Sequence, residues 1–106
     1  MSLNLATILR TSATKFSERP ALHLGEVTLS YGLLHAHAQR FAGALAKLGI
    51  KRGEHVALML PNVPHFSIAY FGSHYGAHPV VPLNVLLSPD EIAYHLEDSQ
   101  AAALVV

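Results

Sequence analysis

The sequence predicts an α/β fold in three layers: a mainly parallel sheet with helices on both faces, plus a short N-terminal β-hairpin near residues 21–29. Apolar runs at 55–60, 79–83 and 102–106 are typical of strands that are buried on both faces of a sheet. A helical segment lies between the first two runs, and a strand–helix–strand unit of this kind is typical of parallel strands.

The first helix is expected to begin after a cap at Asn4 and to end near Ser17. Its apolar stripe comprises Leu5, Ile8, Leu9, Ser12, Ala13 and Phe16. Two short strand candidates follow at 21–24 and 27–29. Gly25-Glu26 separates them and is a two-residue hairpin signal with glycine first.

A long second helix is expected from a cap at Ser30 to about Leu48. Its apolar positions step by four and three, the spacing of a surface that faces a core. These positions are Leu34, Ala38, Phe41, Leu45 and Leu48. Gly49 is expected to end the helix in the left-handed conformation.

The central helix is expected from Pro64 to Tyr75, because proline suits the first helical position. Gly72 would let a neighbouring helix approach closely. The inward face is expected to comprise Phe66, Ala69, Tyr70 and Ser73.

Ser88-Pro89-Asp90-Glu91 matches a capping box, with serine at the cap and glutamate three residues later. The helix that it starts is expected to run to about Glu97. Ile92, Ala93 and Leu96 are expected to face inward.

Composition limits the classes of function. Seven basic and seven acidic residues leave no net charge, which argues against a nucleic-acid or anionic-membrane surface. The chain has no cysteine, no apolar run long enough for a membrane span and no secretory signal, so the cytoplasm is the expected location. Charged residues make up only 13%, so part of the surface is expected to be buried against other structure.

The last predicted strand has no helix after it to cover it, as a complete domain usually would. We therefore expect residues 1–106 to be a truncated piece of a larger domain. Exposed strand edges and apolar helix faces then favour a homo-oligomer.

Eight histidines raise the question of a metal site. His35 and His37 point about 200° apart on a helix, so they cannot share a metal. His74 and His78 are four apart, but Gly76 breaks the helix between them. No transition-metal site is expected, and Glu91 with His95 is expected to be a surface pair.

Catalytic motifs are also missing. The sequence contains no phosphate-binding loop pattern and no nucleophile elbow. Asn62 and Asn84 follow predicted strands, where binding residues often lie, but asparagine in such turns more often satisfies local backbone groups. No catalytic, cofactor-binding or metal residue is predicted in this stretch.

Short segments in a fixed order carry a family resemblance. They are Arg19-Pro20-Ala21-Leu22, Leu29-Ser30-Tyr31, Phe41-Ala42-Gly43-Ala44-Leu45, Leu48-Gly49-Ile50, Gly53-Glu54-His55-Val56-Ala57-Leu58, Leu60-Pro61-Asn62, Phe66, Gly76-Ala77, Pro82-Leu83-Asn84, Glu91-Ile92 and Leu96-Glu97-Asp98-Ser99. Together they resemble the start of the adenylate-forming acyl-CoA synthetases, the AMP-dependent synthetases and ligases. Leu33 departs from the family, which often has glutamate there, so the helix at Ser30 lacks a capping-box partner.

The resemblance implies that residues 1–106 are the N-terminal part of the large N-terminal domain of such a ligase. The whole enzyme would use ATP, magnesium and CoA to convert a carboxylic acid to acyl-AMP and then to acyl-CoA. A fatty acid is the favoured substrate, and an aromatic acid stays open because the acyl pocket is not in this stretch. The isolated piece would be an inactive scaffold. The competing hypothesis is a stand-alone, non-catalytic α/β module for binding or interaction.

Overall fold

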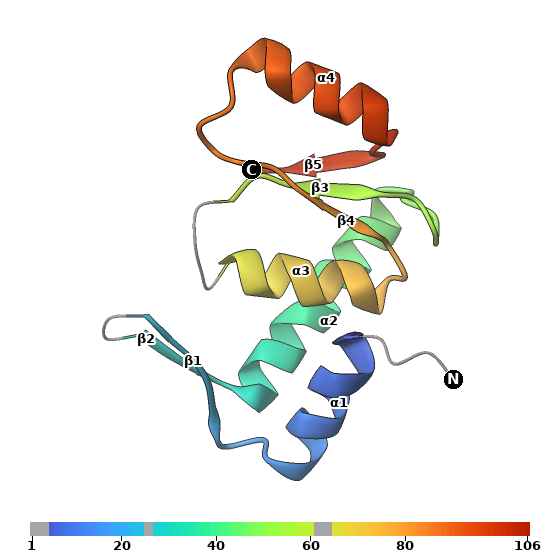
Figure 1. The fold of residues 1–106 in the computed structure, drawn as a ribbon. Helices are drawn as coiled ribbons and strands as arrows, with labels where there is room; N and C mark the ends of the chain where they lie inside the picture. The colour runs from blue at the N-terminus through green and yellow to red at the C-terminus, as the bar shows by residue number, and fades with distance from the viewer. Residues whose placement is uncertain (1–4, 25–26, 61–64) are drawn as a thin grey trace.

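The computed structural model describes residues 5–24, 27–60 and 65–106. Its elements follow in the order α1 (Leu5–Lys15), β1 (Pro20–Leu24), β2 (Val27–Ser30), α2 (Tyr31–Lys47), β3 (Val56–Leu58), α3 (His65–Tyr75), β4 (Val80–Pro82), α4 (Pro89–Ser99) and β5 (Ala103–Val105) (Figure 1). The predicted α/β fold is confirmed.

The three predicted core strands form one parallel sheet in the order β4-β3-β5. All three residues of the central strand β3 are buried, whereas β4 and β5 are partly exposed. The paired strands are shorter than the apolar runs at 55–60, 79–83 and 102–106, because only the middle of each run lies alongside a neighbouring strand.

Helices cover both faces of this sheet, as predicted. In Figure 1, α4 lies on one side of the strands, and α3 and α2 lie on the other. The first helix, α1, packs against α2 and α3 rather than against the sheet. The sheet and its helices therefore form three layers, with α1 outside them.

The predicted hairpin is a separate two-stranded antiparallel sheet, in which Leu22 of β1 lies opposite Leu29 of β2. Its predicted turn, Gly25-Glu26, lies outside the described residues. The backbone N–H of Tyr31 donates to the carbonyl of Arg19 at 3.0 Å, which fixes the base of the hairpin where α2 begins.

The core has two parts. The part between the sheet and the helices α2 and α3 comprises Leu45, Val56, Leu58 and Ala69. The part beneath α1 comprises Leu9, Leu34 and Ala38. The predicted stripes and inward faces are thus confirmed as buried core at five positions: Leu9, Leu34, Ala38, Leu45 and Ala69.

Gly72 has the predicted role at the contact between α2 and α3. A Cβ atom built on it would lie 2.7 Å from Cδ1 of Phe41 and 2.9 Å from the carbonyl oxygen of Ala38. Real Cβ contacts are longer than this, so the two helices can approach to their observed separation only because this residue is glycine.

Some predicted core positions are wrong. Leu48 is 75% exposed, because α2 ends at Lys47 and Leu48 is its cap, turned away from the core. Ile8 of α1 is about half exposed, since this outer helix buries only a narrow stripe. The helix ends at Lys15, short of the predicted Ser17, so Phe16 lies beyond it and is 41% exposed. Ala93 of α4 is also exposed.

The starts of α2 and α4 are capped as the sequence predicts. The side chain of Ser30 accepts a hydrogen bond from the N–H of Leu33 at 3.2 Å, without a reciprocal partner. The capping box of Ser88 and Glu91 is complete in both directions. The predicted Asn4 cap and the Pro64 start lie outside the described residues.

Two helix ends use left-handed residues. Gly49 has φ of +87°, as predicted for the residue that ends α2. The final helix α4 ends at Ser99, two residues beyond the predicted Glu97, because Gln100 takes the left-handed conformation instead.

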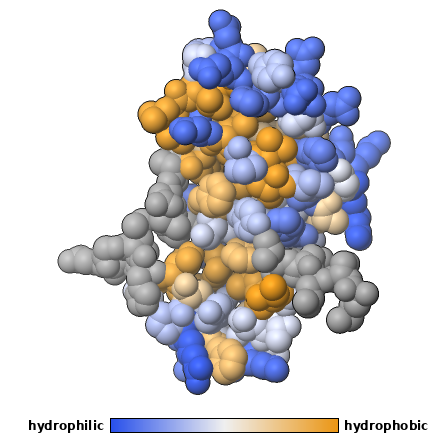
Figure 2. Space-filling model, viewed as in Figure 1, coloured by the Kyte–Doolittle hydropathy of each residue, from blue (hydrophilic) through white to orange (hydrophobic). Residues whose placement is uncertain are grey.

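Apolar surface is concentrated near the ends of the strands. In Figure 2 it gathers at the level where Figure 1 draws β3 and β5, just below the hydrophilic surface of α4. Among the described residues, no helix is long and apolar enough to cross a membrane.

Candidate functional site

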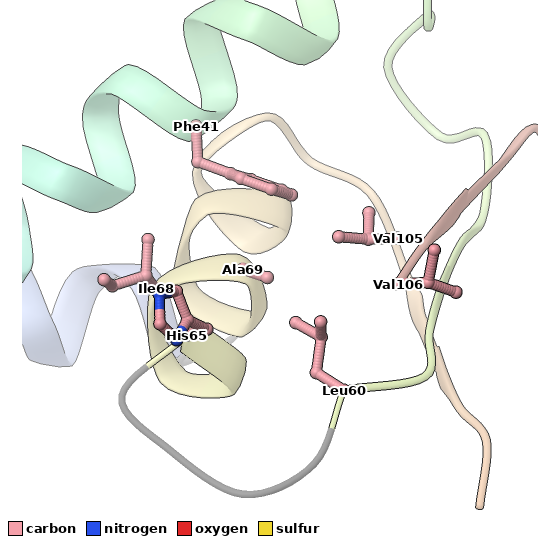
Figure 3. Close-up of a pocket in the computed structure, with 7 residues that line it drawn as sticks. All are labelled: Phe41, Leu60, His65, Ile68, Ala69, Val105 and Val106. Atoms are coloured by element: carbon pink, nitrogen blue, oxygen red, sulfur yellow. The ribbon is translucent and has the colours of Figure 1, made fainter. Parts of the chain in front are cut away.

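The candidate site is a cavity of about 400 Å³ at the carboxyl edge of the sheet, where ligands bind in open α/β folds. It lies between the helices α2 and α3 and the ends of β3 and β5 (Figure 3). Its walls are formed by Phe41, Leu60, His65, Ile68, Ala69, Val105 and Val106.

This cavity is an outward extension of the main core. Ala69 belongs to the buried cluster, and Phe41, Leu60 and Val105 pack against it. Figure 3 shows the side chains of Phe41, Leu60 and Val105 converging on one space. The only side chain among the lining residues that can form hydrogen bonds is His65, at the start of α3. The cavity is therefore suited to apolar groups.

Asn84, at the carboxyl end of β4, stabilises its own loop. Its side-chain oxygen accepts a hydrogen bond from the N–H of Leu86 at 2.8 Å, and the residue is exposed. This arrangement is the common local use of asparagine in a turn. The other asparagine considered from the sequence, Asn62, lies outside the described residues.

Three histidines connect elements that are far apart in the sequence. Nδ1 of His35 on α2 lies 2.6 Å from the hydroxyl of Tyr75 on α3. Nδ1 of His55 lies 2.9 Å from the carbonyl oxygen of Ser99, at the end of α4. Since a carbonyl can only accept, this Nδ1 carries the proton.

His78 makes the third link and is almost completely buried. Its Nδ1 lies 3.0 Å from the carbonyl oxygen of Glu54, so it also donates. The link joins the turn before β4 to the start of β3. The high histidine content thus has a structural use that no sequence spacing revealed, because the partners are 24 to 44 residues away.

The ring of His74 packs edge-on against Tyr70, with 4.7 Å between ring centroids. Burial lowers the pKa of His74 from its ordinary value of 6.5. Within residues 5–24, 27–60 and 65–106, no three histidine or acidic side chains are placed to hold a metal ion. The absence of a transition-metal site stays a prediction.

Glu91 acts at the helix end. Its carboxylate accepts a hydrogen bond from the backbone N–H of Ser88 at 3.1 Å, and this bond is the main reason that the pKa of Glu91 is lowered. The charge of His95 lowers it further. Both residues are on one helix, and the geometry gives Glu91 a capping role.

The lysines and arginines of the described residues are not among those that line the cavity. Lys51 and Arg52 are in the turn before β3, at the amino edge of the sheet, where the N–H of Lys51 is bound by the carboxylate of Glu54 at 2.6 Å. The other cations that the structure describes are on α1, on α2 or next to β1: Arg10, Lys15, Arg19, Arg40 and Lys47. No lysine or arginine therefore lines the carboxyl-edge cavity in the described part of the chain.

The sequence patterns indicate the carboxyl edge of the sheet as the place for a site, but they do not indicate the cavity there. The sequence predicts strands at Leu60 and Val105 and a helix stripe at Phe41, and each is apolar like its neighbours. Only the parallel order β4-β3-β5, together with the position of α2, brings them to one space. No local signal in the sequence distinguishes the lining residues from ordinary core.

Comparison with known proteins gives one consistent result. The family model described as AMP-binding enzyme matches residues 9–106. The chain is 35% identical over 105 residues to a long-chain-fatty-acid–CoA ligase of Salmonella typhimurium, covering 97% of this chain. It is 32% identical over 101 residues to the long-chain-fatty-acid–CoA ligase of Bacillus subtilis, covering 95% of this chain.

Solved structures agree with the sequence comparison. The inhibitor-bound N-terminal domain of FACL13 from Mycobacterium tuberculosis matches with a TM-score of 0.91 and 30% identity, over 97% of this chain and 26% of that one. A benzoate CoA ligase from Burkholderia xenovorans matches with a TM-score of 0.89 and 29% identity, over 97% of this chain and 21% of that one.

The matches cover nearly all of this chain but a small part of its relatives. The chain spans 18% of the length of the two fatty-acid ligases. The family model nevertheless matches far more than half of the residues, from the first helix to the last strand. The chain belongs to the family of AMP-binding enzymes.

Proposed function

We propose that residues 1–106 are the N-terminal part of the large N-terminal domain of an AMP-forming acyl-CoA ligase. The observation that carries the proposal is the family match over residues 9–106, together with relatives that are CoA ligases. In the whole protein, the carboxylate of an acid attacks ATP, forming acyl-AMP and releasing pyrophosphate. The thiol of CoA then takes the acyl group and AMP leaves.

A fatty acid is the substrate class that we favour. The fatty-acid ligases of Salmonella typhimurium and Bacillus subtilis share about a third of their residues with this chain over almost its whole length. The structural match to a benzoate ligase is lower in identity, at 29%. An aromatic acid is therefore the second choice.

The described residues do not fit a nucleotide. A triphosphate with magnesium needs cationic or backbone donors around the phosphates and oxygen ligands for the metal. The described lining residues of the carboxyl-edge cavity include no lysine, arginine or carboxylate side chain, and the side-chain oxygen of Asn84, at the end of β4, is occupied by its own loop. We assign ATP, magnesium and CoA to the rest of the whole protein, and no step of the reaction to this stretch.

The role left for these residues is that of a scaffold. They supply part of a parallel sheet, with its carboxyl edge open on the side where ligands of such folds bind. The cytoplasm is the proposed location. Alone, the chain is expected to associate with itself through its exposed apolar surface, and a clean monomer in light scattering at high concentration would contradict that expectation.

A pyrophosphate-release assay tests the function. The full-length protein that contains these residues and the isolated chain are each incubated with ATP, magnesium and CoA. Fatty acids of increasing length and a set of aromatic acids serve as substrates. We expect turnover by the full-length protein alone, fastest with a fatty acid. Turnover by the isolated chain would refute the scaffold role.

The second candidate, a stand-alone interaction module, is distinguished by the reading frame. A ligase requires several hundred further residues that include a serine-, threonine- and glycine-rich loop with a lysine. A frame that ends without them would favour the module. An inactive full-length protein across the whole set of acids would count against the ligase.

A further inference from the structure

The segment that follows α1 is fixed to the start of α2 through the backbone. The N–H of Tyr31 donates to the carbonyl of Arg19 at 3.0 Å, and the N–H of Gly32 donates to the carbonyl of Ser17 at 2.9 Å. Both N–H groups belong to the first turn of α2, where they have no partner within their own helix. The chain is thus anchored just beyond Lys15, the last residue of α1.

The body of α1 is attached through a narrow apolar stripe. Within residues 7–15, where the structure describes the burial of side chains, Leu9 and Ala13 are the buried ones. Leu9 packs against Leu34 and Ala38 of α2, in the part of the core beneath α1. Two buried side chains, one helical turn apart, are a small attachment for a helix of 11 residues that lies outside the three layers (Figure 1).

A polar cluster adds a second attachment for this helix. The guanidinium carbon of Arg10 lies over the ring of Tyr75 on α3, 4.7 Å from the ring centroid. The hydroxyl of Tyr75 lies 2.6 Å from Nδ1 of His35 on α2, so a hydrogen bond to α2 holds this ring in position. Tyr75 therefore connects the exposed Arg10 of α1 to both of the helices beneath it.

We propose that α1 is a hinged strap, which opens from α2 and α3 as a unit while the sheet and the other helices stay folded. Residues 17–19 are the hinge, because their backbone stays bound to α2, and Arg10 with Tyr75 is the latch. Local opening of this kind is expected where few buried contacts hold an element. Opening would uncover Leu34 and Ala38, so the closed strap keeps this apolar strip of α2 out of water.

Hydrogen exchange of the full-length protein that contains these residues measures the opening, with mass spectrometry of peptides as the readout. Relative to their intrinsic rates, the amides of α1 should exchange at least roughly 10-fold faster than those of the buried strand β3. Low concentrations of urea should accelerate the exchange of α1 less than that of β3, because local opening exposes little surface.

Arg10→Met tests the latch, because methionine has a similar helix propensity and an unbranched side chain but no charge. Loss of the contact between cation and ring should speed the exchange of α1 about two- to fivefold and leave β3 unchanged. Arg40→Met is the matched control, since Arg40 is exposed on α2 and the same change there should alter neither rate. In Tyr75→Leu the exchange of α1 should already be faster, and Arg10→Met should add nothing further.

Equal protection of α1 and β3, with the same dependence on urea, would overturn the proposal, because α1 would then open only when the whole fold opens. A parallel acceleration of α1 and β3 in Arg10→Met would also overturn it, since the change would then weaken the fold as a whole. If Arg10→Met has the same effect with and without the Tyr75 ring, the latch is refuted.

Discussion

Two glycines on neighbouring helices should respond in opposite directions to the same substitution. Gly72 of α3 is buried, and its added methyl group would lie 2.8 Å from Cβ of Phe41 and 2.9 Å from the carbonyl oxygen of Ala38. Both atoms are fixed to the backbone of α2, so a rotation of the Phe41 ring cannot relieve the contact. Gly43 of α2 is exposed and has no atom within 4 Å of its added methyl group.

Alanine favours a helix over glycine by about 1 kcal/mol. Gly43→Ala should gain this amount and raise the melting temperature by about 4–8 °C. Gly72→Ala gains the same propensity, but overpacking costs about 3 kcal/mol, the upper part of the usual range, because α2 and α3 must separate. The expected net loss is about 2 kcal/mol.

Urea denaturation followed by far-UV circular dichroism measures both variants against the parent chain. The expected difference in the free energy of unfolding between them is about 3 kcal/mol, with opposite signs relative to the parent. If Gly72→Ala is as stable as Gly43→Ala, the tight contact of α2 with α3 is refuted.

Three further changes test single interactions. Leu33→Glu should complete the capping box of Ser30 and stabilise the chain by about 0.5–1 kcal/mol in chemical denaturation, because Leu33 is half exposed and has little packing to lose; no gain would contradict the cap geometry. Ser73→Ala should stabilise the chain by about 1 kcal/mol, because the buried Ser73 hydroxyl has no hydrogen-bond partner within the described part of the chain; a loss would reveal a partner. Burial lowers the pKa of His74 in the folded chain, so the unfolded chain binds a proton on this side chain more readily. The neutral His74 side chain therefore contributes fully to the stability of the fold above about pH 6.5, and this contribution is lost as the pH falls through the pKa of the folded chain. Denaturation curves across this pH range should show that the free energy of unfolding of His74→Gln depends less on pH than that of the parent chain. Identical pH profiles for the two chains would contradict the role of His74.

The sequence was most informative where a signal is local. The capping box of Ser88 and Glu91 needs only four consecutive residues, and the end of α2 at Gly49 needs only one. Apolar runs likewise predicted the buried strand β3 and its two parallel neighbours. In each case, the property that fixes the structure belongs to the segment itself.

Features that depend on packing between distant segments could not be predicted. Apolar spacing placed Leu48 on the buried face of α2, but the helix ends one residue earlier and leaves it exposed. The ring of His55 is fixed by a carbonyl 44 residues away. The carboxyl-edge cavity likewise requires Phe41 and Val105, whose positions depend on the order of the strands.

The central claim is that these residues are a scaffold of an acyl-CoA ligase and do not hold its nucleotide. An NMR titration of the 15N-labelled chain with magnesium-ATP, and separately with CoA, tests it most directly, with the full-length protein titrated in parallel by calorimetry. We predict no saturable shifts in the isolated chain and saturable binding to the full-length protein. Saturable shifts at micromolar ligand around Leu60, His65 and Val105 would contradict the claim.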